Sequence, residues 1–290
     1  MPATEMTIGA STWLWTSPLT TAEAEKLLPR IAALGFGCVE LPLENLALLD
    51  PRRLRRVLED HRLVPSVCGV FGPGRDLTHA DVHVRQATQD YIARSLDFTA
   101  EVGARVFCGP LYAEVGKRRP LPPAQRAEEW AVAVEGVRTA CAAAADRGLR
   151  IAIEPINRFE TDLVNTVADA VRLARATEHS AAGVMVDSFH LTIEESDLEQ
   201  ALRDAGDLLL HVQVSENHRG VPGTGLTDWA AFARGVQATG YRGPIVIESF
   251  TTENQDLAGA VCIWKRRTPD QDTFAREGLA FLRRLFASSP

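Results

Sequence analysis

The chain has 290 residues, of which 46% are hydrophobic and 24% charged, a composition typical of a globular protein with a sizeable core. A formal net charge of −7 disfavours a nucleic-acid-binding surface, because phosphate backbones select basic faces. No apolar stretch approaches the ~18 residues that span a bilayer, and the start MPATEMTIGAS lacks the features of a signal peptide. The 5 scattered cysteines lack CxxC spacing and are expected to be reduced. These observations predict a cytoplasmic protein with neither a nucleic-acid nor a membrane partner.

Short apolar segments alternate with helical patterns along the whole chain. The predicted strands cover 6–10, 38–42, 65–70, 105–109, 150–154, 183–187, 208–214 and 244–248. The predicted helices cover 20–34, 51–61, 81–102, 123–147, 166–178, 196–205, 228–239 and 270–287. Near-continuous apolar strands joined by amphipathic helices are typical of a parallel sheet covered by helices.

The number of strand–helix units decides between two α/β architectures. Repetition of the unit to the end of a 290-residue chain predicts one (β/α)8 TIM barrel, a single domain over residues 1–290. A doubly wound sheet is the alternative. It is disfavoured because no GxGxxG or GxxxxGK[ST] motif follows any predicted strand.

Three late predicted strands end in a carboxylate, in the segments RIAIE, GVMVD and PIVIE. In such a barrel, functional groups gather at the C-terminal ends of the strands. A single carboxylate there is equally well explained by capping or a salt bridge. Three converging ones, Glu154, Asp187 and Glu248, would repel one another unless a cation lay between them. The pattern therefore predicts a divalent-metal site.

The strand LLLHVQV offers the fourth ligand. Side chains alternate along a strand, so His211 and Gln213 share one face. Gln213 lies at the level of the carboxylates, whereas His211 lies about 6–7 Å deeper, at ~3.3 Å per residue. We expect His211 to be a hydrogen-bonded interior histidine and Gln213 to supply a carbonyl oxygen, a hard donor that suits Mg²⁺ or Mn²⁺.

Other polar residues follow the same strand ends. Glu160 follows in EPINRFET, His190 in DSFH and Arg219 in SENHRGVPGTG. Asn157 and Arg158 are expected to brace the loop or pair with Glu160, and His190 is expected to meet substrate from an exposed loop. Candidate aromatic walls are Trp13, Trp15, Phe71, Tyr112, Phe250 and Trp264, each of which alone is more often a packing residue. As a set, these groups suit a small polyol.

The segments IAIEPINRFET, MVDSFHLTIEE, SENHRGVPGTG and IVIESF match, in order and spacing, motifs of a known family. The chain resembles the xylose-isomerase-like sugar isomerase/epimerase barrels, most closely the ketose 3-epimerases that act on tagatose, psicose or ribulose. The resemblance covers essentially the whole barrel. It implies a homodimer or tetramer and a Mn²⁺ site, with Mg²⁺ or Co²⁺ as alternatives. The residues it implies are Glu154, Asp187, Gln213 and Glu248 for the metal, and Glu160, His190 and Arg219 for the sugar.

Gln213 departs from this family pattern. Most ketose 3-epimerases carry histidine there, whereas hydroxypyruvate isomerases, which are similar barrels, carry glutamine. The predicted reaction is epimerisation at C3 of a free ketose through an enediolate. In it, Glu154 and Glu248 serve as catalytic acid and base on opposite faces, as the family picture implies.

Three alternatives remain open at this stage. Gln213 favours an aldose–ketose or hydroxypyruvate-type isomerase, which moves the proton between C1 and C2. An apurinic-site endonuclease would need more histidine ligands and a basic face, and a metal-free sugar-binding barrel would gain nothing from three repelling carboxylates. No glycine-rich nest or lysine-rich loop marks a phosphate site, which favours a free sugar, although Arg75 or Arg118 could bind a phosphate group.

Overall fold

The computed structural model describes residues 6–287. The first five and last three residues of the predicted domain 1–290 lie outside this range, as does the beginning of the segment on which the absence of a signal peptide was argued. Among the helices of the described part, none is long and apolar enough to cross a lipid bilayer.

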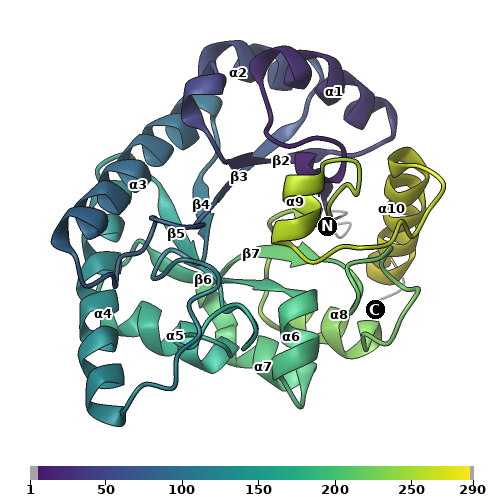
Figure 1. Cartoon of the computed structure of the whole chain (residues 1–290). Coiled ribbons are helices and arrows are strands. Elements are labelled where there is room, and N and C mark those ends of the chain that lie inside the picture. Colours follow the sequence, from purple (N-terminus) through teal and green to yellow (C-terminus); the bar gives the residue numbers. More distant parts are fainter. Residues whose placement is uncertain (1–5, 288–290) are drawn as a thin grey trace.

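Parallel strands follow one another around a closed barrel, in which each pairs with the next and β8 pairs with β1 (Figure 1). Their bounds are β1 Ile8–Ser11, β2 Cys38–Leu43, β3 Val64–Gly69, β4 Val106–Gly109, β5 Arg150–Ile153, β6 Ala182–Asp187, β7 Leu209–Val214 and β8 Ile245–Ile247. Most strand residues are buried, which accounts for the near-continuous apolar runs in the sequence. The predicted (β/α)8 barrel is confirmed.

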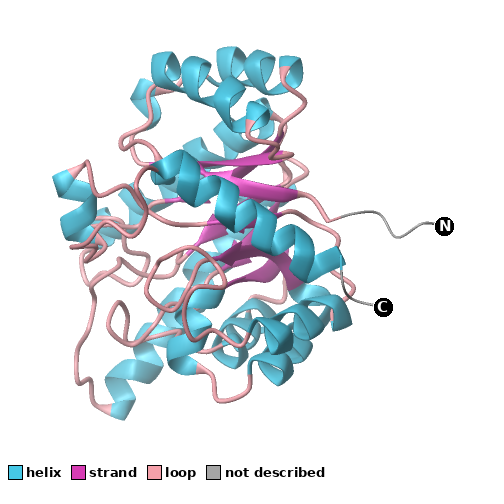
Figure 2. Ribbon diagram, turned by 90° about the vertical axis from the view of Figure 1, so that its right-hand side faces the viewer, coloured by secondary structure: helices cyan, strands magenta, loops and turns pink. Residues whose placement is uncertain are grey.

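Helices surround the strands as an outer layer (Figure 2). The predicted ones are α1 Thr21–Ala33, α2 Pro51–Asp60, α3 Val82–Val102, α4 Pro123–Ala145, α5 Val167–Ala176, α7 Leu198–Ala205, α8 Trp229–Ala238 and α10 Gln271–Ala287. Local chemistry explains where they begin. Thr20 and Glu23 form a capping box at α1, and Asp50 caps α2 with Pro51 in the first turn.

The helical prediction omitted two short elements, α6 Ser188–Glu194 and α9 Gln255–Ala260. Neither spans two turns, so no apolar periodicity could reveal them. Side chains cap both: Asp187 accepts from Phe189 N, and Asn254 accepts from Leu257 N. Single turns of 3-10 helix, also not predicted, are η1 Thr12–Leu14, η2 Leu46–Leu48 and η3 Gly206–Leu208. Figure 1 shows α9 inside the ring of outer helices.

The outer helices α7 and α8 meet at Gly235, and this contact allows a test of the packing. A Cβ atom added to Gly235 would lie 2.7 Å from Cβ of Leu202, too close for a real contact. Alanine is favoured over glycine in a helix by about 1 kcal/mol, but overpacking costs about 1–3 kcal/mol. Because Leu202 Cβ cannot swing away, we expect Gly235→Ala to lower the free energy of unfolding in urea by about 1 kcal/mol.

Gly259→Ala in α9 is the matched control. Nothing lies within 4 Å of its added Cβ, so only the helix propensity acts and stability should be equal or higher. Equal stabilisation by both substitutions would contradict the close α7–α8 approach.

Candidate active site

Three buried carboxylates gather at the C-terminal ends of the strands. Glu154 follows β5, Asp187 ends β6 and Glu248 follows β8; their exposed fractions are 5%, 0% and 5%. The sheet ladder positions two of them, because Glu154 N donates to Gly109 O at 3.1 Å and Glu248 N to Val214 O at 3.0 Å. The structure therefore brings together the carboxylates that the sequence singled out.

Burial and mutual repulsion perturb these groups strongly. Burial raises the pKa of Glu154 well above its usual value, and the charges of Glu248 and Asp187 raise it further. Burial also raises the pKa of Glu248 to about 8, although Arg219 opposes the shift. A cluster of this kind needs a cation to stay ionised near neutral pH.

Arg219 supplies positive charge from within the chain. Its Nη1 donates to Asp187 Oδ2 and, at 2.9 Å, to Glu248 Oε2. Its guanidinium carbon lies 4.0 Å from the ring centre of Phe189 and 5.2 Å from that of Phe250. Although burial lowers the pKa of Arg219, Asp187 and Glu248 raise it above its usual value. The residue expected to contact the sugar therefore also bridges two carboxylates.

His190 lies in α6 and is buried, so the expectation that it stands in an exposed loop was wrong. The short capped helix turns the ring inward, which a loop assignment could not anticipate. Its Nδ1 accepts from Asn157 N at 3.2 Å, so in the neutral ring the proton sits on Nε2. Nε2 lies 3.6 Å from Glu154 Oε1. Burial, reinforced by Arg219 and opposed by Glu160, lowers the pKa of His190 to about 3.

Asn157 and Arg158, which were expected to brace this loop or pair with Glu160, have different partners in the structure. Asn157 Nδ2 donates to Glu160 Oε1 at 2.8 Å and lies 2.8 Å from His190 Nδ1. Arg158 instead forms an ion pair with Glu194, at 2.9 Å between Nη2 and Oε2. Asn157 thereby links Glu160 to His190 beside the carboxylates.

Gln213 is oriented by a buried carboxylate to which the sequence assigned no role. Its Nε2 donates to Glu40 Oε1 at 2.6 Å, while His211 Nε2 lies 2.7 Å from Glu40 Oε2 and Ser66 Oγ donates to the same oxygen at 3.0 Å. The only sequence signal was an acid inside the apolar run CVELP. His211 is hydrogen-bonded and buried in the interior, as expected.

This orientation leaves the amide oxygen of Gln213 free. Gln213 Oε1 is buried and has no hydrogen-bond partner within residues 6–287. A buried polar atom without a partner is costly, and Gln213 pairs in register with Asp187 across β6 and β7. One neutral oxygen and three carboxylates fit a hard divalent cation such as Mg²⁺ or Mn²⁺.

Cysteines approach this region: the potential ligand atoms of Cys68, Glu40 and Glu248 lie within 4.8 Å of one another. Cys108 lies with Glu40 and His211 in a group whose potential ligand atoms are all within 4.8 Å of one another. Burial raises the pKa of the Cys108 thiol to about 12, so the thiol stays protonated. The four buried cysteines and the exposed Cys262 are all free, in agreement with the expected reduced state.

Glu216 anchors the β7–α8 loop that carries Arg219. Its Oε1 accepts from the backbone N–H of Asn217 and Thr227, and its Oε2 accepts from Gly223 N–H and Trp229 Nε1. Burial raises the pKa of Glu216, but these donors outweigh it and the net pKa is lowered. The charged carboxylate therefore stabilises the loop.

The lowered pKa gives Glu216 a predictable effect on stability. A depressed folded-state pKa means that the stabilisation is present above the unfolded value, ~4.3, and is lost as pH falls through the folded value. Glu216→Gln should therefore lower the free energy of unfolding at pH 7 by about 1–3 kcal/mol. The difference from the unsubstituted protein should shrink below about pH 4 in urea titrations. A difference independent of pH would contradict this assignment.

Comparison with known proteins places the chain in a family. The family model for a xylose isomerase-like TIM barrel matches residues 28–285. A ketose 3-epimerase of Arthrobacter globiformis is 30% identical over 281 residues, 96% of each chain. An L-ribulose 3-epimerase of Methylomonas sp. (strain DH-1) is 28% identical, covering 96% of this chain and 97% of the relative.

Solved structures agree. A structure of L-ribulose 3-epimerase superposes with a TM-score of 0.92 at 26% identity, covering 98% of this chain and 95% of that chain. A D-allulose 3-epimerase from Methylomonas sp., in complex with D-allulose, gives a TM-score of 0.88 at 28% identity, covering 97% and 98%. The predicted isomerase class is confirmed by these relatives. The chain belongs to the xylose isomerase-like TIM barrel family and resembles the ketose 3-epimerases within it.

Proposed function

We propose that this protein is a metal-dependent ketose 3-epimerase, which inverts C3 of a ketose through an enediolate. The supporting observation is the pair of buried glutamates, Glu154 and Glu248, which directly follow β5 and β8, two strands that are not neighbours in the barrel. Two buried carboxylates that come from different strands, and of which one charge acts on the other, are suited to act on opposite faces of a single carbon. Full-length similarity to ketose 3-epimerases supports the same reaction.

The residues that would hold the metal ion are Glu154, Asp187, Gln213 and Glu248. They offer three carboxylates and the unpartnered Oε1 of Gln213. A bound divalent cation, Mn²⁺ in the first instance and Mg²⁺ or Co²⁺ otherwise, would polarise the C2 carbonyl and lower the energy of the negative charge that follows deprotonation.

Two glutamates would carry out the two proton transfers. One of Glu154 and Glu248 accepts the C3 proton on its carboxylate oxygen, and the other delivers a proton to the opposite face. In the reverse direction the two exchange roles. His190 offers Nε2–H, Arg219 offers guanidinium N–H groups and Glu160 offers carboxylate oxygens, which together would orient the sugar hydroxyls.

The main alternative function is an isomerase, which would use the same side chains to move a proton on a different carbon. Gln213, where the ketose 3-epimerase resemblance led us to expect histidine, favours proton transfer between C1 and C2, as in an aldose–ketose or hydroxypyruvate isomerase. The curated relatives named above favour C3. An endonuclease or a sugar-binding protein has no comparable support. A homodimer or tetramer and a cytoplasmic location are further parts of the proposal.

Proton exchange in D₂O tests the reaction and the two glutamates together. With added Mn²⁺, the unsubstituted protein should introduce deuterium at C3 of D-fructose, D-tagatose or ribulose and produce the epimer, read by NMR after chelation. Because each glutamate transfers a proton directly, Glu154→Gln and Glu248→Gln should each slow the exchange about 10²–10⁴-fold.

Glu128 is an exposed acid on α4, and Glu128→Gln is the matched control. This variant should catalyse deuterium exchange at C3 at the rate of the unsubstituted protein. Deuterium at C1 or C2, with an aldehyde product or with hydroxypyruvate as substrate, would overturn the 3-epimerase assignment in favour of the isomerase.

Metal binding tests Gln213 independently of turnover. Gln213→Ala removes the free amide oxygen, so calorimetric titration with Mn²⁺ should show affinity weaker by about tenfold or more. Gln125→Ala, at an exposed position of α4, should leave the affinity unchanged. Unchanged affinity in Gln213→Ala, together with a loss in His211→Asn, would transfer the ligand role to His211.

A further inference from the structure

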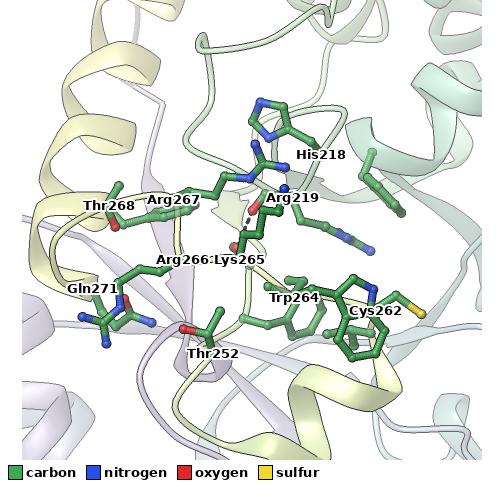
Figure 3. A pocket seen from close by; sticks show the side chains of 16 residues that line it. His218, Arg219, Thr252, Cys262, Trp264, Lys265, Arg266, Arg267, Thr268 and Gln271 are labelled. Carbon is green, nitrogen blue, oxygen red and sulfur yellow. Dashed lines mark hydrogen bonds between the residues drawn. The ribbon is translucent and has the colours of Figure 1, made fainter.

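A cavity of about 400 Å³ lies beside the carboxylate cluster, between the β7–α8 loop, the end of β8 and the segment 261–268 (Figure 3). Its charged lining residues are Arg219, Lys265, Arg266 and Arg267. Among the described residues that line it, none is acidic, although the chain as a whole carries a net charge of −7. Charged lining residues of one sign only, in a protein of opposite net charge, favour an anionic ligand.

Two of these cations are already engaged. Arg219 bridges Asp187 and Glu248, and Arg266 pairs with Glu253 at 2.8 Å and donates to Pro269 O at 3.1 Å. Their charge is therefore largely balanced within the protein.

The other two cations are not balanced. Lys265 and Arg267 form no hydrogen bond or ion pair with any residue of the described range 6–287. Figure 3 shows both on the side of the cavity where His218 and Arg219 lie, away from Arg266 and Gln271. Their nitrogens are thus available to a ligand between the segment 261–268 and the β7–α8 loop.

The cavity adjoins the proposed reaction centre. Arg219 lines the cavity with Ser249 and Phe189, which directly follow Glu248 and precede His190 in the chain. Its volume lies within the ~300–1,000 Å³ typical of small-molecule sites. A sugar placed with C2 and C3 against the carboxylates could extend its far end into this basic space.

The sequence offered two arginines, Arg75 and Arg118, as possible phosphate ligands. Arg118 is exposed and does not line the cavity, and Arg75 is already engaged. Arg75 donates to the carbonyls of Val70 at 2.6 Å and Glu44 at 2.7 Å, and its guanidinium carbon lies 3.9 Å from the ring centre of Tyr91. Because its N–H groups already donate to backbone carbonyls, Arg75 stabilises the loops and is not available to bind a phosphate. The run Lys265–Arg267, which the sequence analysis did not single out, is the better candidate.

We infer that the natural substrate is a ketose with an anionic substituent, a phosphate ester or a carboxylate, at the end of the sugar remote from C2 and C3. Lys265 and Arg267 bind this group through charge-assisted hydrogen bonds. The inference rests on the proposed 3-epimerase function and revises its expected free-sugar substrate.

Three sugars that differ only at C6 provide the test: D-fructose, D-fructose 6-phosphate and D-fructuronate. With Mn²⁺ present, kcat/KM for exchange at C3 should be about tenfold or more higher for at least one anionic sugar than for D-fructose. In the double variant Lys265→Gln/Arg267→Gln, the ratio of anionic to neutral kcat/KM should fall by about tenfold or more, and the preference in the unsubstituted protein should weaken with added salt. The phosphate and carboxylate arms identify which anion is used.

The matched control is Lys26→Gln/Arg56→Gln, which removes the same charge from exposed positions of α1 and α2. It should keep the anionic-to-neutral ratio of the unsubstituted protein. A ratio that falls equally in both double variants would indicate a general charge effect and overturn the proposed subsite. Thermal unfolding of both variants checks that the fold is retained.

A second measurement separates this inference from the proposed reaction. Calorimetric titration with D-fructose 6-phosphate measures binding without turnover, and its affinity should fall in Lys265→Gln/Arg267→Gln. Exchange on D-fructose with no anionic preference would overturn the subsite and leave the epimerase proposal standing. Binding that depends on the two cations, without exchange on any sugar, would support the anion subsite and contradict the epimerase proposal.

Discussion

The repulsion among three buried carboxylates is the constraint on which the rest of the site depends. Glu154, Asp187 and Glu248 are held together by the closure of the barrel, so they cannot separate to relieve it. Burial raises the pKa of two of them, because the charged forms are unfavourable there without a cation. Arg219 satisfies part of this need, and the unpartnered oxygen of Gln213 supports the proposal that a metal ion supplies the rest.

The surroundings of the cluster are organised to keep these charges in place. Arg219 has a φ of 58°, a left-handed conformation that costs about 1–2 kcal/mol for a residue other than glycine. Its backbone is held from both ends, since its N–H donates to Glu216 O at 2.8 Å and its carbonyl accepts from Ser249 Oγ at 2.7 Å. Glu216 in turn gathers the loop around its carboxylate. The backbone position of Arg219, whose guanidinium stabilises the cluster, is thereby fixed before any ligand binds.

Glu40 determines which end of the Gln213 amide faces the proposed metal site. A glutamine amide has two chemically different ends, and a free side chain could present either one. Because Glu40 accepts from Gln213 Nε2, the carbonyl oxygen is the end left over for a cation. A histidine has no amide group, so it would not need a neighbour to orient one. The departure from the family pattern is therefore accommodated by a residue on β2, far away in sequence.

The sequence alone determined the alternation of strands and helices, because burial on both strand faces and the helical period leave direct traces in the order of apolar residues. It also located the carboxylates, since an acid at the end of an apolar strand is conspicuous. The inward turn of His190, the engagement of Arg219 with Asp187 and the orientation of Gln213 by Glu40 depend on short helices, loops and contacts between distant strands. Such contacts leave no periodic signal, so only the tertiary structure decided them.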